Sequence, residues 1–194
     1  MEILTHRIRH TWWRCWLALL ALLTSTVCTH HADAQTVSRE TQLKAVLLYN
    51  LTQFVEWPGS VFSGSNAPLV IGILGQDAFG RVLDDAVRGE KYNTRPIVVR
   101  RCQTIEEGCS CQILFVSSSE SSKLSEIISQ LKGREVLTVG DFDGFVRAGG
   151  MIRFTKSSQD KIRLRINADA AKAAELSVSG KLLRVAEIIR PEQD

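Results

Sequence analysis

The sequence predicts a single three-layer α/β domain, in which helices cover both faces of a mainly parallel sheet and an antiparallel hairpin follows near the C-terminus. Short, continuously apolar runs such as 69–75 lack the alternation of half-exposed strands, which is typical of strands buried on both faces. Amphipathic helical segments separate these runs, and that order favours a parallel sheet. Segments 151–154 and 162–166 alternate between apolar and polar residues, which is typical of a hairpin with one face in solvent.

The first 34 residues are typical of a secretory signal peptide. Three arginines precede a short apolar run at 15–23, and a small-residue site ends at Ala34. We expect cleavage after Ala34, a periplasmic location and a mature domain of residues 35–194. An uncleaved anchor and a lipoprotein attached at Cys28 remain alternatives.

The first predicted helix covers residues 38–58. Its apolar residues recur at helical spacing, Ser38 stands as a cap and Pro58 ends the helix. A strand at 69–75 follows, and then a helix at 77–89 with Asp77 as its cap.

The remaining segments continue the alternation and then break it. We expect strands at 96–102, 112–117 and 136–140 with a helix at 119–133, then the hairpin, a helix at 168–176 and an extended segment at 176–179. The last predicted helix covers 180–189, capped by Ser179, with a buried stripe of Leu182, Leu183, Ala186 and Ile189.

The composition of the mature chain excludes several kinds of site. All four histidines leave with the signal peptide, which excludes a histidine general base, a Ser-His-Asp triad and a His-ligated zinc site. The signal peptide also removes three arginines and two acidic residues, which leaves 21 basic and 19 acidic residues. So small a net charge, spread along the chain, does not indicate nucleic-acid binding.

The segment 136–150 carries two aspartates after an apolar run, as phosphoryl-transfer enzymes of the haloacid-dehalogenase type do. The Thr that such enzymes need after the Asp-x-Asp-Gly pattern is missing, and no acidic pair follows downstream. We therefore expect Asp141 and Asp143 to form a turn, and we predict no catalytic residue.

A ligand crevice is expected at the carboxyl ends of the parallel strands, where such sheets usually bind ligands. The residues expected to line it are Gly75, Asp77, Ser117, Ser119 and Asp141. The glycines of 72–80 fit neither a dinucleotide-binding nor a P-loop pattern, and we predict no cofactor.

Three cysteines, Cys102, Cys109 and Cys111, remain in the mature chain. An oxidising compartment favours a disulfide and leaves one thiol over. A metal site would need a fourth ligand, so we predict none.

Six ordered segments together resemble the YfiR-like family of bacterial exported proteins, over about residues 41–189: KAVLLYNLTQFVEWP, PLVIGILGQDAFG, RPIVVRRC, CQILFVS, LTVGDFDGFVRAGGMIRF and LSVSGKLLRVAEII. The resemblance implies a periplasmic α/β protein, often dimeric, without known catalysis. The best-understood member restrains an inner-membrane diguanylate cyclase through that enzyme's periplasmic sensor domain, and so keeps cyclic di-GMP and biofilm formation low.

The resemblance also bears on individual residues. It suggests a disulfide between Cys102 and Cys111, with Cys109 unpaired or competing, although the cysteine pattern departs from that of the best-understood member. It places the GDFDG turn in a family without phosphatase activity. Phe142 and Phe145 are then expected to anchor that loop in the core.

The resulting hypothesis is a non-enzymatic regulator that binds the periplasmic domain of an inner-membrane signalling protein and does not itself insert into the membrane. An exposed apolar patch would carry the contact, with Phe54, Trp57 and Phe62 as candidates and the last helix as another. A homodimer is expected. The alternative is a periplasmic small-molecule-binding protein that uses the strand-end crevice.

Overall fold

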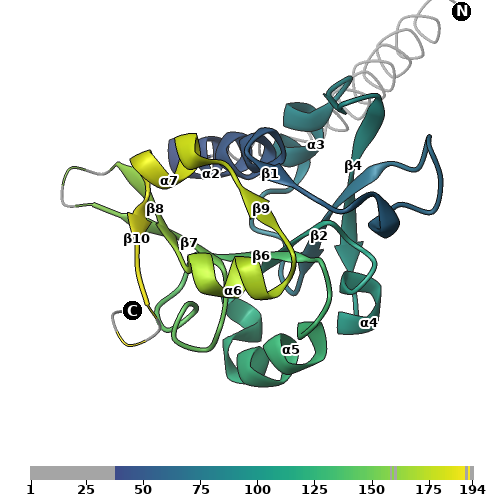
Figure 1. The fold of residues 1–194 in the computed structure, drawn as a ribbon. Helices are drawn as coiled ribbons and strands as arrows, with labels where there is room; N and C mark the ends of the chain where they lie inside the picture. Colours follow the sequence, from purple (N-terminus) through teal and green to yellow (C-terminus); the bar gives the residue numbers. More distant parts are fainter. Residues whose placement is uncertain (1–37, 158, 160, 191, 193–194) are drawn as a thin grey trace, which may run out of the picture. The chain divides into compact units, whose positions relative to one another are not determined.

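The computed structural model describes residues 38–157, 159, 161–190 and 192, so the predicted signal peptide lies outside the described residues. Within them, eight strands form one sheet in the order β10-β8-β7-β6-β5-β2-β4-β3 (Figure 1). Neighbours are parallel except for β7 with β8 and β3 with β4. The strands are β2 (Leu69–Leu74), β3 (Lys91–Tyr92), β4 (Arg95–Cys102), β5 (Ile113–Val116), β6 (Leu137–Gly140), β7 (Ile152–Lys156), β8 (Ile162–Ile166) and β10 (Glu187–Ile188). The predicted α/β class, its mainly parallel sheet and its hairpin are confirmed.

Helices lie on both faces of this sheet, as predicted. The helices are α2 (Arg39–Asn50), α3 (Arg81–Val87), α4 (Ile105–Gly108), α5 (Leu124–Leu131), α6 (Ala168–Ala173) and α7 (Gly180–Val185). Buried residues of α2, α3, α6 and α7 join one apolar core. Buried residues of α5 join a second core across the sheet, and the partly buried Ile105 of α4 packs against it.

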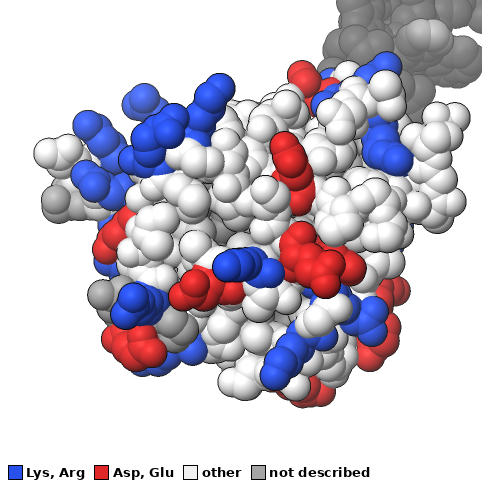
Figure 2. All heavy atoms as spheres, viewed as in Figure 1, with Lys and Arg blue, Asp and Glu red and all other residues white. Residues whose placement is uncertain are grey.

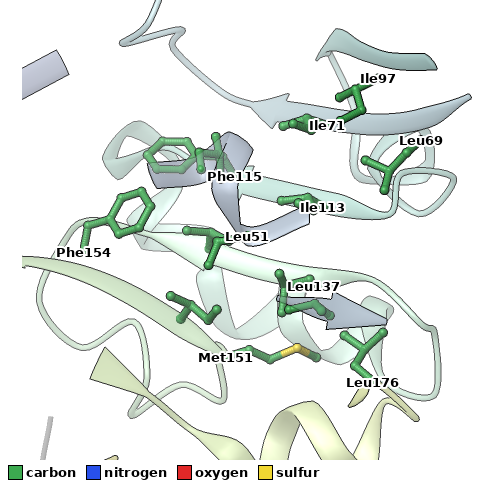
Figure 3. Close-up of a cluster of buried hydrophobic side chains, with 14 of the residues drawn as sticks. Leu51, Leu69, Ile71, Ile97, Ile113, Phe115, Leu137, Met151, Phe154 and Leu176 are labelled. Carbon is green, nitrogen blue, oxygen red and sulfur yellow. The ribbon is translucent and has the colours of Figure 1, made fainter. Parts of the chain in front are cut away.

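All six residues of β2 are buried, because the strand contributes alternate side chains to the two cores. Leu69, Ile71 and Ile73 belong to the first core, whereas Val70 and Leu74 belong to the second. Figure 3 shows how the first core extends from β2 and β4 through Ile113 and Phe115 to Met151 and Leu176. A continuous apolar run is therefore the expected sequence of this central strand.

The first helix is shorter than predicted, because α2 ends at Asn50 instead of continuing to Pro58. A 3₁₀ turn at Leu51–Gln53 follows, and β1 (Val55–Glu56) then pairs antiparallel with β9 (Ser177–Val178). The backbone amide of Ser179 donates to the carbonyl of Phe54 at 2.8 Å. A pairing partner more than a hundred residues away thus overrides the local helical pattern.

The predicted helices at 77–89 and 180–189 are also shorter than expected. Helix α3 begins at Arg81, and Asp77 accepts hydrogen bonds from the amides of Phe79 and Gly80 in the turn before it. Ser179 caps α7 as predicted, but α7 ends at Val185. The following residues form β10, which pairs parallel with β8 at the edge of the sheet.

Candidate functional site

The carboxyl ends of β2 and β5 lie side by side, since Leu74 pairs with Val116. Strand β2 has β4 on one side and β5 on the other. The chain therefore crosses from one side of β2 to the other between β4 and β5, and in parallel sheets ligand crevices usually form at such a reversal. Ser119 occupies the space directly over Gly75, whereas a cavity of about 320 Å³ lies beside it, lined by Leu74 and Glu120. A Cβ atom on Gly75 would lie 2.5 Å from Ser119 Oγ, and that hydroxyl accepts a hydrogen bond from the amide of Gln76 at 2.9 Å.

The other residues predicted for this crevice also bind parts of the same chain. Asp77 Oδ2 accepts from Arg101 Nε at 2.9 Å, while its Oδ1 holds the turn before α3. The buried Ser117 hydroxyl accepts from the amide of Ser119 at 3.4 Å. None of the five predicted residues lines any of the cavities described below, so ligand binding at the strand ends stays a prediction.

Asp141 is held by an ion pair that joins α2 to the loop after β6. Lys44 Nζ lies 2.8 Å from Asp141 Oδ2 and 2.8 Å from Glu40 Oε1. The hydrogen bond from Lys44 lowers the pKa of the Glu40 carboxyl. Burial alone would favour the neutral amine of Lys44, but the hydrogen bonds to Asp141 and Glu40 outweigh it and raise the pKa of Lys44. The carboxylate of Asp141 therefore has a structural partner.

The loop between β6 and β7 is anchored by Phe145, as expected. Its ring is fully buried and lies against the backbone of Gly140 and Gly150, where any Cβ atom would collide with it. The half-buried Phe142 packs edge-to-face on Phe145 with a centroid distance of 5.5 Å. The exposed Asp143 forms an ion pair with Arg153. These contacts describe a packed turn.

The structure brings two of the three cysteines together beneath β2. Cys102 Sγ and Cys111 Sγ are both buried and lie 3.9 Å apart, next to the α-carbon of Gly72. Burial raises the pKa of both thiols, that of Cys111 to about 12, where Cys102 adds to the effect. All three cysteines are thiols here, with Cys109 half-buried. The Cys102–Cys111 disulfide stays a prediction.

The aromatic residues after α2 form a cluster around Tyr92. Trp57 is only 7% exposed, and its indole Nε1 donates to the carbonyl of Gln112 at 3.0 Å. Phe62 stacks on Tyr92, and the Arg95 guanidinium lies 4.1 Å from the Phe62 ring centroid. Trp57 is therefore an internal anchor in this structure, whereas Phe54 and Phe62 are half-buried. Their role in a partner contact stays a prediction.

A cavity that the sequence did not predict lies between α5 and α6. Its volume is about 510 Å³, within the range of small-molecule sites. Small residues of α6 form one wall and α5 forms the other, over Thr138 and Met151. The only signal in the sequence was the run of alanines in α6, which is equally typical of an ordinary packed helix. The lining residues are Ser125, Ile128, Ser129, Leu131, Lys132, Gly133, Thr138, Gly149, Met151, Ala170, Ala173 and Ala174.

Two smaller cavities are more polar in character. One of about 320 Å³ lies between α4 and α5, and one of about 140 Å³ lies beside Cys109 and Arg134. Among the described residues, no group of three or more His, Cys, Asp or Glu side chains could hold a metal ion. In the same part of the chain, no helix has the length and apolar character needed to cross a bilayer.

Residues 41–187 match the sequence profile of the YfiR/HmsC-like family. The chain belongs to this family. The match covers the sheet from β2 to β8, the loop after β6 and the first residue of β10. No curated protein sequence is significantly similar to this YfiR/HmsC-like chain.

Two solved structures resemble this family member in part. One is described as the ABC domain in complex with L-Trp from Streptococcus pneumonia, with 12% identity and a TM-score of 0.49 over 77% of this chain and 60% of that one. The other is a conserved domain protein from Vibrio cholerae, with 12% identity and a TM-score of 0.49 over 76% of this chain and 59% of that one. The chain spans about three fifths of the length of each.

Proposed function

We propose that this protein is a non-enzymatic periplasmic regulator that binds the periplasmic sensor domain of an inner-membrane signalling protein of the diguanylate cyclase type. Such binding would restrain cyclic di-GMP synthesis and biofilm formation. The observation that carries the proposal is the family match over residues 41–187.

The regulator would act by binding one conformation of its partner more tightly than another. A bound protein shifts a partner's equilibrium only by the difference between its affinities for the two conformations. The proposed contact uses the half-buried Phe54 and Phe62, and Trp57 holds Phe62 in place through their shared neighbour Tyr92. A homodimer would match the symmetry of a dimeric partner.

Co-purification from the membranes of the natural host tests this proposal. The tagged mature chain, residues 35–194, is incubated with detergent-solubilised membranes, with and without reductant, and the bound proteins are identified by mass spectrometry. We expect a membrane protein with a cytoplasmic cyclase domain. Recovery of no membrane protein, or of the same proteins by a Phe54→Ser/Phe62→Ser variant, would contradict the proposed contact.

The cavity between α5 and α6 favours a second candidate function, the binding of a small apolar molecule. We favour this cavity over the predicted strand-end crevice because it is larger and more apolar than the cavity beside Leu74 and Glu120 at the strand ends. A thermal-shift screen with apolar metabolites tests this function. Ala173→Trp would fill the cavity and abolish any shift, whereas Ala168→Trp, outside the lining, would leave it. A shift retained by Ala173→Trp would exclude this cavity.

A further inference from the structure

One edge of the sheet concentrates exposed basic side chains. Figure 2 shows them gathered over the β7–β8 hairpin and α7. Helix α7 leads directly into β10, and β10 pairs with β8, so hairpin and helix share this edge. We call the exposed residues Lys161, Arg163, Lys181 and Arg184 the basic edge.

Two acidic residues of this region, Glu187 and Glu40, are already bound to other cations. Glu187 accepts a hydrogen bond from Arg165 at 3.1 Å. Glu40 is bound by Lys44 at 2.8 Å and lies 3.5 Å from Lys156. Within the described part of the chain, no carboxylate forms an ion pair with any residue of the basic edge. The net charge of the full chain is only +3, so this is a local excess of positive charge.

Apolar side chains are exposed beside these cations. Lys181, Arg184 and Val185 share one face of α7, at positions i, i+3 and i+4, while Leu182 faces the core. Val185 is 79% exposed and Ile188 of β10 is 51% exposed. Two large aliphatic residues in solvent next to these cations are not explained by the packing of this domain.

We propose that the basic edge binds the surface of an anionic phospholipid bilayer. Phosphate groups would neutralise the four cations, and Val185 and Ile188 would rest in the apolar boundary beneath the headgroups. A lipid surface offers phosphate groups and hydrocarbon together. A protein partner would need a pocket shaped for Val185, whereas fluid lipid adapts to the side chain. The attachment is peripheral and holds the domain against the membrane. It is independent of the proposed regulatory function.

Flotation with lipid vesicles tests this inference. Residues 37–194 form a compact unit with its own core, so the mature chain 35–194 is the appropriate protein. It is mixed with vesicles of phosphatidylcholine alone or of phosphatidylcholine and phosphatidylglycerol in equal parts. We expect binding only to the vesicles with phosphatidylglycerol, and a steep loss of binding as salt is raised.

Lys181→Gln/Arg184→Gln is expected to weaken binding about 25-fold, because each surface cation contributes roughly a factor of five. The matched control is Lys91→Gln/Lys132→Gln. It removes the same charge from β3, at the opposite edge of the sheet, and from the end of α5. We expect the control to bind like the wild type. Circular dichroism verifies that all variants are folded, since the four side chains are exposed.

Three results would overturn the inference. The first is no binding to vesicles with phosphatidylglycerol at low salt. The second is an equal loss in the two double variants, which would indicate attraction by net charge alone. The third is loss of a co-purifying membrane protein by Lys181→Gln/Arg184→Gln without any vesicle binding by the wild type, which would assign the basic edge to an acidic protein. By contrast, if Val185→Ser binds vesicles less than the wild type does at high salt, where charge attraction is screened, this would support the apolar contribution.

Discussion

Gly72 is the residue that makes room for the buried thiols. A Cβ atom there would lie 2.6 Å from Cys111 Sγ and 3.0 Å from a methyl carbon of Leu114. Gly72→Ala is therefore expected to lower the free energy of unfolding by about 1–3 kcal/mol, as overpacking of a core usually does. Urea unfolding measures it.

The matched control for Gly72 is Gly59→Ala, because no atom lies within 4 Å of a Cβ at Gly59. Its effect should stay within about 0.5 kcal/mol. Adding Cys111→Ala to Gly72→Ala removes the colliding sulfur, so the two effects should not add. Simple additivity would show that Cys111 is not what restricts this position.

The two buried thiols predict a dependence of stability on alkaline pH. In the unfolded chain a thiol loses its proton near pH 9, whereas in the folded protein the pKa of Cys111 is raised to about 12 and that of Cys102 is also raised. The folded state then holds protons that the unfolded state has released. For the reduced protein, the free energy of unfolding should be unaffected by the thiols below pH 9 and fall as the pH rises from 9 toward 12.

Urea midpoints of the reduced protein between pH 8 and about pH 10 measure this slope, below the usual pKa of Lys44. The Cys102→Ala/Cys111→Ala variant should be less stable throughout but lack the alkaline slope. Oxidation to a Cys102–Cys111 disulfide should also remove the slope. An unchanged slope in the double variant would assign it to other groups.

The contact between α2 and the loop after β6 depends on one largely buried lysine. Lys44→Met keeps the aliphatic stem and removes the charge, so Asp141 loses its partner while only 19% exposed. We expect a loss of about 1–2 kcal/mol in unfolding free energy, between typical values for surface and buried ion pairs. Arg88→Met, which removes an ion pair to Asp85 that is exposed at both ends, is the control. Equal losses would contradict a special role for Lys44.

The elements that the sequence predicted correctly are those whose pattern is local. The apolar run of β2 follows from burial on both faces, and the alternation of β8 follows from burial on one face. Each pattern can be recognised within the strand's own residues. The ends of α2 and α7 were wrong because each depends on a distant partner: Val55 pairs with Val178, and Ile188 pairs with Ile166. Local propensity carries no information about such pairings.

The site was less predictable than the fold, because it depends on which side chains fill which spaces. Ser119 was expected in an open crevice, and its hydroxyl instead packs over Gly75. Trp57 was expected on the surface, and its indole is an internal hydrogen-bond donor. The cavity beside α6 results from the distance between two helices, which no residue pattern specifies.

At the scale of the whole molecule, family membership, an expected signal peptide and a basic edge support the proposal that this protein works in the periplasm beside a membrane. Deleting residues 2–34 should leave the protein in the cytoplasm and abolish function without loss of stability, because the described core begins at Ala45. Cell fractionation measures the location. Normal function of the protein retained in the cytoplasm would contradict a periplasmic partner.

The level of cyclic di-GMP in the natural host tests the proposed regulation most directly. Deletion of the gene should raise cyclic di-GMP and biofilm, and the full-length chain supplied in trans should restore both. A chain without residues 2–34 should not restore them, which separates action through a periplasmic domain from an effect inside the cell. Unchanged cyclic di-GMP after deletion, in a strain whose cyclases are active, would contradict the proposal.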